Sequence, residues 1–357
     1  MSKPKRILIA PLNWGLGHAT RCIPIIQELI RQGQEVWIAS DGRALNLLKR
    51  EFPQLPALSL PAYSIRYSQK WFLFYLLLQA PKIGWAIIHE HRTVRRWIQA
   101  YEFDAVISDN RLGCFSSQIS SVVISHQLRI FTRPAWIGKI AGFLHRWILG
   151  QYDRCWIPDL EGPQNLSGDL AHGISQASLQ YMGPLSRMKK GASPEKEEYD
   201  VLVVLSGPEP QRTQWEKCIL AQAAHLPYRW LIVQGKPEEK RCSRPQPHIE
   251  LHSFLGTKAL NEAFLKSRLI ISRSGYSTIM DLAVLGKKAL LVPTPGQPEQ
   301  EYLAVYGQAK GWFHTQNQRK LDLKKGVEEA EKTEGIQLTD WDRSELGVFI
   351  KNWLDSF

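Results

Sequence analysis

The feature that most constrains the fold is an alternation of short, apolar, strand-like runs with helical stretches, which occurs twice along the 357-residue chain. In the first half, ILIAPL at 7–12 and DAVISD at 104–109 have the uninterrupted apolar character of buried strands. In the second half the pattern restarts with DVLVVLSG at 200–207 and continues with RLIISRSG at 268–275. Strands that alternate with helices predict parallel sheets covered by helices. We therefore expect two α/β domains.

The remaining apolar runs and amphipathic stretches complete the same plan in both halves. Further strands are expected at 35–40, 121–125, 153–159, 229–235 and 288–293. Helices are expected at 19–31, 69–100, 134–149, 211–224, 257–266, 276–285 and 299–310. Pro81 is expected to divide the stretch 69–100 into two helices, because proline removes a backbone donor and crowds the preceding turn.

Residues 183–198 separate the halves, since Gly, Pro, Ser and charged residues are typical of a linker. We expect an N-terminal domain over 1–183 and a C-terminal domain over 184–339. An amphipathic stretch over 340–357 is expected to form a helix that packs back across the N-terminal domain. The predicted fold is thus α/β, with two Rossmann-like domains whose parallel sheets face a central cleft.

Composition and charge exclude several classes of protein. With 44% hydrophobic and 22% charged residues, the chain is an ordinary globular one. Its five cysteines are scattered without a CxxC pair, which argues against a disulfide framework or a zinc site and favours the cytoplasm. The net charge is +11, and the first 183 residues hold 20 basic against 12 acidic side chains. A basic surface attracts phosphates or anionic lipids, but no nucleic-acid-binding motif occurs. No secretory leader is expected.

Ligands of parallel α/β sheets bind beyond the carboxyl ends of the strands, so the loops there hold the candidate site residues. In PLNWGLGHATR at 11–21, Gly17 opens a helix whose N–H groups favour a negative ligand. His18 can accept a proton near neutral pH, although a lone histidine is more often structural. Other polar side chains of these loops are candidates for the acceptor side. They are Asn13, Asp109, Asn110 and His126.

The loops of the second half offer groups suited to phosphate and sugar. Hydroxyls, backbone amides and one cation stand at strand ends and helix starts, where they suit phosphate oxygens. They belong to Ser206, Gly207, Arg212, Ser274, Gly275 and Ser277. Asp281 lies about two turns into a helix and can accept hydrogen bonds from ribose hydroxyls, while Gln300 and Glu301 suit the hydroxyls of a sugar ring. A simple Pro-rich turn remains the alternative for 205–212.

The order and spacing of these motifs resemble a known group of enzymes. The G-L-G-H loop, the Ser-Gly loop and the later RSG…D…QE-Y pattern are similar to the GT-B glycosyltransferases. Within them, the pattern most resembles family 28, the group of MurG and the galactosyldiacylglycerol synthases. The LNWGLGHATR version is similar to an uncharacterised bacterial branch. The resemblance covers the whole chain in plan and is specific over 272–304 and 13–18.

The resemblance implies a UDP-sugar as co-substrate, no further cofactor, and roles for single residues. The serine and glycine loops match those that contact the donor diphosphate. Asp281 stands where the family has a ribose-binding carboxylate, usually Glu. Phe254 and Leu255 match the segment that reads uracil through its backbone. Gln300 and Glu301 match a sugar-contacting pair that is often Gln-Gln, so Glu301 leaves the sugar open, with N-acetylglucosamine favoured.

The resemblance also implies an inverting transfer to a hydroxyl, without a metal, and the sequence has no DxD pair to hold one. His18 matches the N-domain histidine proposed as general base or acceptor-site residue. Asp109 is a second candidate base, and His126 ranks below both. Arg212, backbone amides and helix dipoles are expected to stabilise the departing diphosphate.

The segment 70–98 points to the acceptor, because it is aromatic and apolar and then basic at Arg92, Arg95 and Arg96. Such a surface suits an anionic membrane leaflet, while two core helices are the alternative. We expect a lipid-linked or cell-envelope glycan acceptor and a cytoplasmic enzyme peripheral to the inner face of the membrane. The competing functions are a non-catalytic UDP-sugar-binding or scaffold subunit and an enzyme like the UDP-N-acetylglucosamine 2-epimerases.

Overall fold

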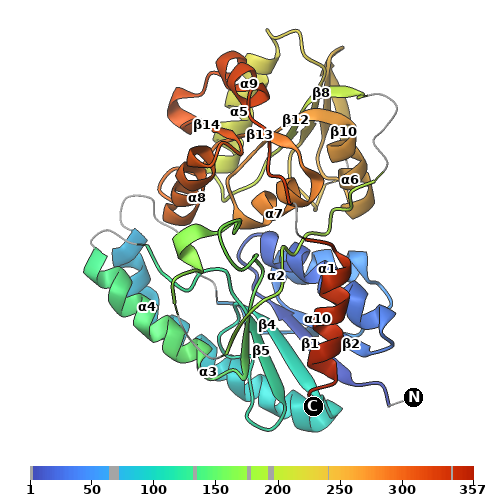
Figure 1. Ribbon diagram of the computed structural model, residues 1–357, viewed down its shortest axis with the longest axis vertical. Helices are drawn as coiled ribbons and strands as arrows, with labels where there is room; N and C mark the ends of the chain where they lie inside the picture. The colour runs from blue at the N-terminus through green and yellow to red at the C-terminus, as the bar shows by residue number, and fades with distance from the viewer. Residues whose placement is uncertain are drawn as a thin grey trace. The chain divides into compact units, whose positions relative to one another are not determined.

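The chain forms two compact units in a computed structural model (Figure 1). Unit 1 comprises Met1–Leu185 together with Asp340–Phe357, and unit 2 comprises Ser186–Thr339. The structure describes residues 3–63, 72–131, 135–174, 178–191, 197–239, 241–338 and 341–357. Each unit is described by itself below.

The sheet of unit 1 has seven parallel strands in the order β3-β2-β1-β4-β5-β6-β7. The strands are β1 (Arg6–Pro11), β2 (Glu35–Ser40), β3 (Ala57–Ser59), β4 (Ala105–Asp109), β5 (Ser120–Ile124), β6 (Arg154–Ile157) and β7 (Leu179–Tyr181). The long central strands were predicted from their apolar runs, which are buried on both faces as parallel strands must be. The short edge strands β3 and β7 were not predicted.

The helices of unit 1 connect these strands. They are α1 (Gly17–Arg31), α2 (Gly42–Glu51), α3 (Phe72–Tyr101), α4 (Ala135–Leu149), a 3₁₀ turn (Gly168–Leu170) and α10 (Ser344–Leu354). The predicted break at Pro81 is wrong, because α3 is continuous and contains Pro81 in its interior. A proline costs a helix about 3 kcal/mol, which a 30-residue helix packed on the core can offset. On its buried side, Val94 and Ile98 pack into the core beneath the sheet.

The C-terminal helix α10 packs on α1 within unit 1 (Figure 1). Trp353 is almost fully buried, and its ring meets the ring of Trp156 on β6 edge to face, with 5.1 Å between centroids. Phe349 contacts the same Trp156 ring at 5.1 Å, and Trp353 Nε1 donates to Ser120 Oγ at 3.3 Å. Burying one such aromatic side chain contributes roughly 2–3 kcal/mol, so α10 is part of the core of unit 1.

The sheet of unit 2 also has seven strands, in the order β10-β11-β9-β8-β12-β13-β14, and only β10 is antiparallel to its neighbour. The strands are β8 (Tyr199–Val204), β9 (Trp230–Val233), β10 (Cys242–Gln246), β11 (Ile249–His252), β12 (Ser267–Ser272), β13 (Lys288–Leu291) and β14 (His314–Thr315). Both units are therefore Rossmann-like, in agreement with the predicted α/β class.

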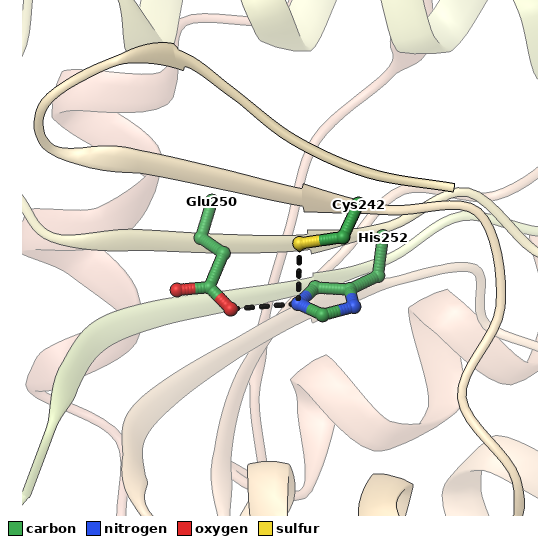
Figure 2. Close-up of side chains that lie close together, drawn as sticks. All are labelled: Cys242, Glu250 and His252. Carbon is green, nitrogen blue, oxygen red and sulfur yellow. Dashed lines mark hydrogen bonds and ion pairs between the residues drawn. The ribbon is translucent and has the colours of Figure 1, made fainter. Parts of the chain in front are cut away.

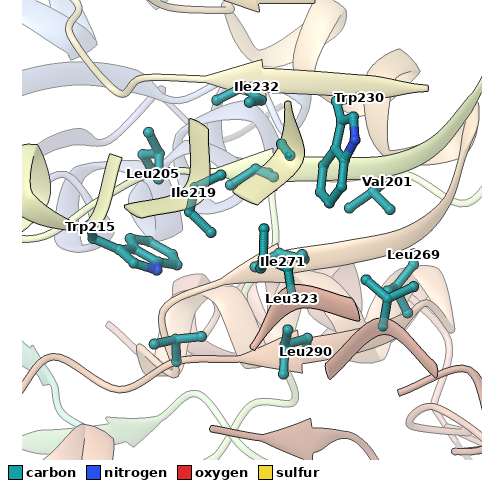
Figure 3. Close-up of a cluster of buried hydrophobic side chains, with 14 of the residues drawn as sticks. Val201, Leu205, Trp215, Ile219, Trp230, Ile232, Leu269, Ile271, Leu290 and Leu323 are labelled. Carbon is teal, nitrogen blue, oxygen red and sulfur yellow. The ribbon is translucent and has the colours of Figure 1, made fainter. Parts of the chain in front are cut away.

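The helices of unit 2 are α5 (Gln211–Ala223), α6 (Thr257–Leu265), α7 (Tyr276–Leu285), α8 (Pro298–Ala309), a 3₁₀ turn (Gln318–Lys320) and α9 (Leu323–Glu331). On one side of the sheet, Trp215 of α5 and Leu323 of α9 pack on Trp230, Ile271 and Leu290 of the strands (Figure 3). Helix α9 was not predicted, because its sequence LKKGVEEAE is largely polar. It nevertheless buries Leu323, Val327 and Ala330, which lie on one helical face.

Each sheet reverses its strand order at one point, and ligands bind parallel sheets beyond the carboxyl ends of the strands at such points. In unit 1 the reversal lies between β1 and β4, where Pro11 pairs with Asp109 at the carboxyl ends. In unit 2 it lies between β8 and β12, where Val204 pairs with Ser272. These two strand ends are the places to look for chemistry.

Candidate functional site

At the switch point of unit 1, a histidine and an arginine converge on one buried carboxylate. Asp109 ends β4, and His18 stands in the first turn of α1, which follows the neighbouring strand β1. His18 Nδ1 lies 2.8 Å from Asp109 Oδ1. Arg21, one turn further along α1, donates from Nε to Asp109 Oδ2 at 2.5 Å and from Nη2 to Oδ1. The strand order thus brings together residues that lie 88 to 91 positions apart in sequence.

This contact sets the orientation and the proton position of the imidazole. Two partners of Nδ1 make opposite demands, because Asp109 Oδ1 at 2.8 Å only accepts and Arg21 Nη2 at 2.9 Å only donates. We assign the proton to Nδ1, where it bonds to the charged carboxylate. The other ring nitrogen, Nε2, then presents its lone pair, and it has no hydrogen-bond partner among the described residues. The His18 side chain is 14% exposed, whereas Asp109 is fully buried. Of the two, only His18 is open to a ligand.

The electrostatics hold Asp109 charged and His18 neutral. Burial alone would raise the pKa of the Asp109 carboxyl, but the charges and hydrogen bonds of Arg21 and His18 outweigh it, and this pKa lies well below its usual range. Burial lowers the pKa of His18 below its ordinary value, and the charge of Asp109 opposes this effect only in part. A neutral imidazole oriented by a fixed negative charge can accept a proton and is stabilised once it has done so.

Arg21 was not among the residues predicted from sequence, although it lies three residues after His18 and therefore on the same helical face. Its guanidinium also donates from Nη1 to His126 Nδ1 at 2.9 Å. His126 is 5% exposed and contacts the Arg21 side chain that binds Asp109. Cys22 adds a further buried contact, with its Sγ 3.6 Å from Asp109 Oδ2. The predicted residue His126 is therefore a buried neighbour of this cluster, in contact with Arg21.

The two asparagines expected on the acceptor side differ in what they contact. Asn13 Nδ2 donates to Asp41 Oδ2 at 2.9 Å, and its Oδ1 accepts from the backbone N–H of Ala44 at 3.2 Å. The Asn13 amide therefore fixes the loop before α1 to the start of α2. Asn110 adopts the left-handed conformation, with φ of 56°, directly after Asp109. Its Oδ1 is buried and accepts no hydrogen bond from the described residues.

At the switch point of unit 2, the loop after β8 exposes its backbone. Ser206 and Gly207 are both exposed. Gly207 has φ of +107°, a conformation that side chains rarely adopt. A Cβ at this position would lie 3.5 Å from Thr294 Oγ1 and 3.8 Å from Arg273 Nε. The loop thus brings its backbone close to two polar groups of neighbouring strand ends.

Those two polar groups were not predicted, and both have unsatisfied hydrogen-bonding atoms. Arg273 is 1% exposed, and its Nη groups donate to the carbonyls of Val292 and Pro293 and to Gln318 Oε1. Arg273 Nε and Thr294 Oγ1 are buried and have no hydrogen-bond partner within the described chain.

No carboxylate pairs with Arg273 among the described residues. Its guanidinium carbon lies 4.0 Å from the centroid of the Trp215 ring, in a cation–π contact. Burial lowers the pKa of this guanidinium to about 9. A buried cation without a counter-charge is costly, and an anion beside it would relieve that cost. The sequence signal was the arginine placed directly before the Ser-Gly pair at the end of β12.

Ser274, Gln300 and Glu301 hold the backbone of this region. Ser274 Oγ donates to the carbonyl of Gln300 at 2.7 Å, and Gln300 Oε1 accepts from the N–H of Thr294 at 2.8 Å. Glu301 is exposed, and its Oε1 accepts from the N–H of Gly296 at 2.9 Å. Gln300 Nε2 lies 3.9 Å from the Cβ position of Gly275, the residue that begins α7. These contacts join the start of α7 to the start of α8.

Asp281 lies inside α7, and its carboxylate accepts from the Ser186 hydroxyl at 2.5 Å. Burial raises the pKa of Asp281 to about 6, although the charge of Arg187 and the hydrogen bond from Ser186 oppose this shift. Ser277 is half-buried in the first turn of the same helix. Phe254 and Leu255 are half-buried and follow β11 at its carboxyl end, before α6 begins at Thr257.

Arg212, which the sequence suggested as a cation for a diphosphate, already has partners in its own segment. Its Nε donates to Glu209 at 2.7 Å, its Nη1 to Glu216 at 2.6 Å and its Nη2 to Thr213 at 2.8 Å. The side chain is 8% exposed and is held by Glu216 on α5, four residues further along the helix, and by Glu209 in the loop before it. Arg273, which lacks such partners, is the better cation for an anionic ligand.

Both the sequence and the fold of this chain are similar to those of known glycosyltransferases. Residues 214–338 match the model of the glycosyltransferase family 28 C-terminal domain. An uncharacterized glycosyltransferase of Methanosarcina mazei is 25% identical over 322 residues, which cover 83% of this chain and 82% of that protein. A UDP-N-acetylglucosamine–N-acetylmuramyl-(pentapeptide) pyrophosphoryl-undecaprenol N-acetylglucosamine transferase of Methylobacterium radiotolerans is 45% identical over 80 residues, 21% of either chain.

Solved structures with the same fold span the whole chain. A glycotransferase of kitacinnamycin has a TM-score of 0.64 at 15% identity and covers 100% of this chain and 96% of its own. Acinetobacter baumannii MurG has a TM-score of 0.57 at 12% identity, covering 98% and 100%. A UDP-GlcNAc 2-epimerase from Neisseria meningitidis has a TM-score of 0.63 at 14% identity, covering 98% and 100%. These likenesses show the two-unit fold of the GT-B glycosyltransferases, and residues 214–338 of this chain match the C-terminal domain of glycosyltransferase family 28.

Proposed function

We propose that this glycosyltransferase transfers a hexose or N-acetylhexosamine, with N-acetylglucosamine favoured, from a UDP-sugar to a hydroxyl of a lipid-linked or cell-envelope glycan. The observation that carries the proposal is the oriented imidazole of His18 on the carboxylate of Asp109. The choice of sugar and acceptor is supported by the Methylobacterium radiotolerans relative, whose name specifies N-acetylglucosamine and a pyrophosphoryl-undecaprenol acceptor.

The proton transfer follows from the geometry of His18. In the proposed reaction the acceptor hydroxyl gives its proton to His18 Nε2 while its oxygen forms a bond to C1 of the sugar. The bond between C1 and the β-phosphate oxygen breaks, and UDP leaves with that electron pair. Attack opposite the leaving UDP inverts the configuration at C1. Asp109 is fully buried and bound on both oxygens, so we assign it the positioning of His18 and the stabilisation of its imidazolium.

The donor diphosphate is assigned to the switch point of unit 2. The backbone at Ser206 and Gly207 and the N-terminus of α7 at Gly275 offer N–H groups to phosphate oxygens. Arg273 supplies the counter-charge, and its Nε and the Thr294 hydroxyl supply unsatisfied hydrogen-bonding groups. These groups stabilise the charge that develops as UDP departs, and the proposed transfer uses no metal ion.

The nucleoside and the sugar are assigned to the flanking loops. Asp281 is the acceptor for ribose hydroxyls, and the backbone of Phe254 and Leu255 is the contact for uracil. Gln300 and Glu301 are assigned to the hydroxyls of the transferred sugar. The carboxylate of Glu301 accepts hydrogen bonds only, so it suits a sugar hydroxyl and not a carbonyl oxygen.

Replacing His18 tests the proposed reaction directly. We expect His18→Ala to lower kcat with UDP-N-acetylglucosamine and a lipid-linked acceptor by about 10²–10⁴-fold, because a general base contributes that much. The affinity for UDP, measured by calorimetry, should stay within about threefold of the wild type, since a base acts on the acceptor proton and not on UDP binding. The matched control is His225→Ala, an exposed histidine of unit 2, which should retain full turnover.

Three outcomes of these measurements separate the candidate functions. Unchanged turnover in His18→Ala would remove this residue from the mechanism. UDP binding without UDP release in the presence of lipid acceptors would identify a non-catalytic subunit. Epimerisation of UDP-N-acetylglucosamine in the absence of an acceptor would favour the 2-epimerase activity, whose fold this chain shares.

An exposed apolar face of α4 supports a membrane-bound acceptor. Ile140, Phe143, Leu144 and Trp147 recur at three- and four-residue spacing, and all four are more than half exposed. On α3, Trp85 is 68% exposed, and exposed arginines follow at positions 92, 95 and 96. Apolar faces with nearby basic residues suit an anionic leaflet. We assign this surface to the inner face of the cytoplasmic membrane.

Within the residues that the structure describes, no helix combines the length and the hydropathy needed to cross a bilayer. Attachment would therefore rest on the α4 face. Replacing Trp147 by Glu should reduce co-sedimentation with anionic vesicles by about thirtyfold, since burying an aromatic ring contributes roughly 2 kcal/mol. Val305→Glu is the control, because Val305 is a 70%-exposed apolar residue on α8 of unit 2. Equal sedimentation of both variants would contradict the assignment.

A further inference from the structure

A hairpin at the edge of the unit 2 sheet brings three metal-ligating side chains onto one face. Strand β10 is the outermost strand, and it pairs antiparallel with β11 so that Cys242 lies directly opposite His252. Glu250 precedes His252 by two residues on β11, and side chains two apart project from the same face of a strand. The three residues are distant from the loops assigned to the diphosphate in sequence, and no role has been assigned to them above.

The reactive atoms of these side chains converge on one ring nitrogen (Figure 2). Cys242 Sγ lies 3.6 Å from His252 Nε2, and Glu250 Oε1 lies 2.6 Å from the same nitrogen. All three ligand atoms lie within 4.8 Å of one another. No other group of three such residues this close occurs in the part of the chain that the structure describes.

These separations fit a tetrahedral zinc ion with little rearrangement. With Zn–S of about 2.3 Å and Zn–N of about 2.0 Å, tetrahedral geometry places sulfur and nitrogen ligands about 3.5 Å apart. The observed separation of Cys242 Sγ and His252 Nε2 is 3.6 Å. Nitrogen and oxygen ligands should be about 3.3 Å apart, so the Glu250 carboxylate has to withdraw by roughly 0.7 Å. A side chain on a half-exposed strand can do so by a small rotation.

The carboxylate is already oriented by partners of its own. Its other oxygen, Glu250 Oε2, accepts from Arg244 Nη2 at 3.1 Å and from the Tyr199 hydroxyl at 3.3 Å. These contacts leave Oε1 directed at His252, while the pKa of Glu250 is lowered by the hydrogen bond from His252 and by Arg244. Outer partners that fix one carboxylate oxygen and leave the other for the ion are a regular feature of metal sites.

We propose that Cys242, Glu250 and His252 form a binding site for a zinc-class divalent cation at the open end of the β10–β11 hairpin. The ion would displace the thiol proton to solvent, and the Nε2 proton that now faces Glu250 would be replaced by one on Nδ1, so that Nε2 offers its lone pair to the metal. Thiolate and carboxylate together balance its two positive charges. The exposed position of Cys242 leaves the fourth position to water. A thiolate and an imidazole select zinc, cobalt or similar ions over magnesium.

The sequence argued against zinc because its cysteines form no CxxC pair. A CxxC pair supplies two ligands from one short segment. The present site instead combines a single cysteine of β10 with two residues of the next strand, β11. The ion would join the first residue of β10 to the last residue of β11. It would thereby fasten an edge strand whose residues are mostly exposed and which contains Pro245.

Metal titration of the full-length protein, first stripped with a chelator, tests the site. We expect one equivalent of Zn²⁺ per chain by calorimetry, with no competition from excess Mg²⁺. Bound Co²⁺ should show thiolate-to-metal charge-transfer absorption and the visible bands of tetrahedral coordination. Cys242→Ser and His252→Ala should each weaken binding by about 100-fold or more, because each removes a ligand atom. The matched control, Cys218→Ser, changes a cysteine of the same unit that lies outside the cluster and should bind as the wild type does.

A variant beside the cluster separates ligand binding from mere folding of the hairpin. Arg244→Ala keeps all three ligands and should weaken Zn²⁺ binding by about tenfold, as the loss of an outer partner does. Absence of saturable Zn²⁺ binding to the wild type would overturn the proposal. The proposal would also be overturned if Cys242→Ser or His252→Ala bound Zn²⁺ as tightly as the wild type does. It would equally be overturned if the Co²⁺ absorption were lost in Cys218→Ser.

Discussion

The switch points of the two units solve the problem of buried charge in opposite ways. In unit 1, the positive Arg21 and the negative Asp109 lie in direct contact, and His18 completes the carboxylate's hydrogen bonds. In unit 2, Arg273 is equally buried, and its partners among the described residues are carbonyl and amide oxygens and an aromatic ring. The first site is complete without a ligand, as suits a group that moves a proton. The second lacks a negative charge, as suits a site that binds an anion.

Asp109→Asn should lower stability and turnover more than the other variants do. It removes the carboxylate beside Arg21, so that the buried arginine of unit 1, like Arg273 of unit 2, no longer contacts a carboxylate. Breaking a buried ion pair costs about 3–5 kcal/mol, since Arg21 would be left without its counter-charge. Turnover should also fall by about 10³–10⁴-fold, because the amide no longer fixes the proton on His18 Nδ1. Chemical denaturation and kcat measure the two effects. In the double variant with Arg21→Leu, stability should recover in part while turnover does not. Recovery of both would mean that Asp109 serves stability alone.

Arg273→Met should have an intermediate effect, seen mainly when UDP is present. Loss of charge-assisted contacts to phosphate should weaken UDP binding by about 10–100-fold. The free energy of unfolding without UDP should fall by less than in Asp109→Asn, because no buried carboxylate is left unpaired. Denaturation with and without saturating UDP compares the two variants. If Arg273→Met binds UDP normally, unit 2 has its anion site elsewhere, and the contrast between the units fails.

The smallest expected effect concerns pH and Asp281. Its pKa in the folded protein is about 6, above the ordinary value, so its contribution to stability is present at low pH and is lost as pH rises through about 6. Binding of ribose hydroxyls needs the ionised form and should have the opposite dependence, weakening by up to about tenfold per pH unit below 6. Calorimetry with UDP between pH 5 and 7.5 measures this. In Asp281→Asn, UDP affinity should vary with pH only as far as the titration of UDP itself requires. If the variant shows the same pH profile of UDP affinity as the wild type, Asp281 does not bind the ribose.

The contrast between the units also explains what the sequence could and could not predict. Buried strands such as β1 and β8 were found because both faces of a central parallel strand are apolar. Edge strands such as β14, with two residues, carry too little pattern to be recognised. His18 and Asp109 were each singled out from their loops, but their contact depends on β1 and β4 being neighbours. Strand order is not readable from local periodicity.

Residues that act through burial were missed more often than residues in loops. Arg21 and Arg273 look like surface cations in sequence, because arginine is seldom fully buried. Arg212 was predicted because it ends the loop at 205–212, yet Glu209 and Glu216 already bind it. Glu216, four residues further along the same helix, could have indicated this from sequence.

Because α10 packs on Trp156, unit 1 is built from the two ends of the chain. Unit 2 is one continuous segment, Ser186–Thr339, whereas unit 1 is closed only when the last helix returns to it. Unit 2 is therefore inserted into the chain of unit 1 and is encoded by a single stretch of sequence. A truncation at the end of the protein would remove part of the core of unit 1, the unit that contains His18.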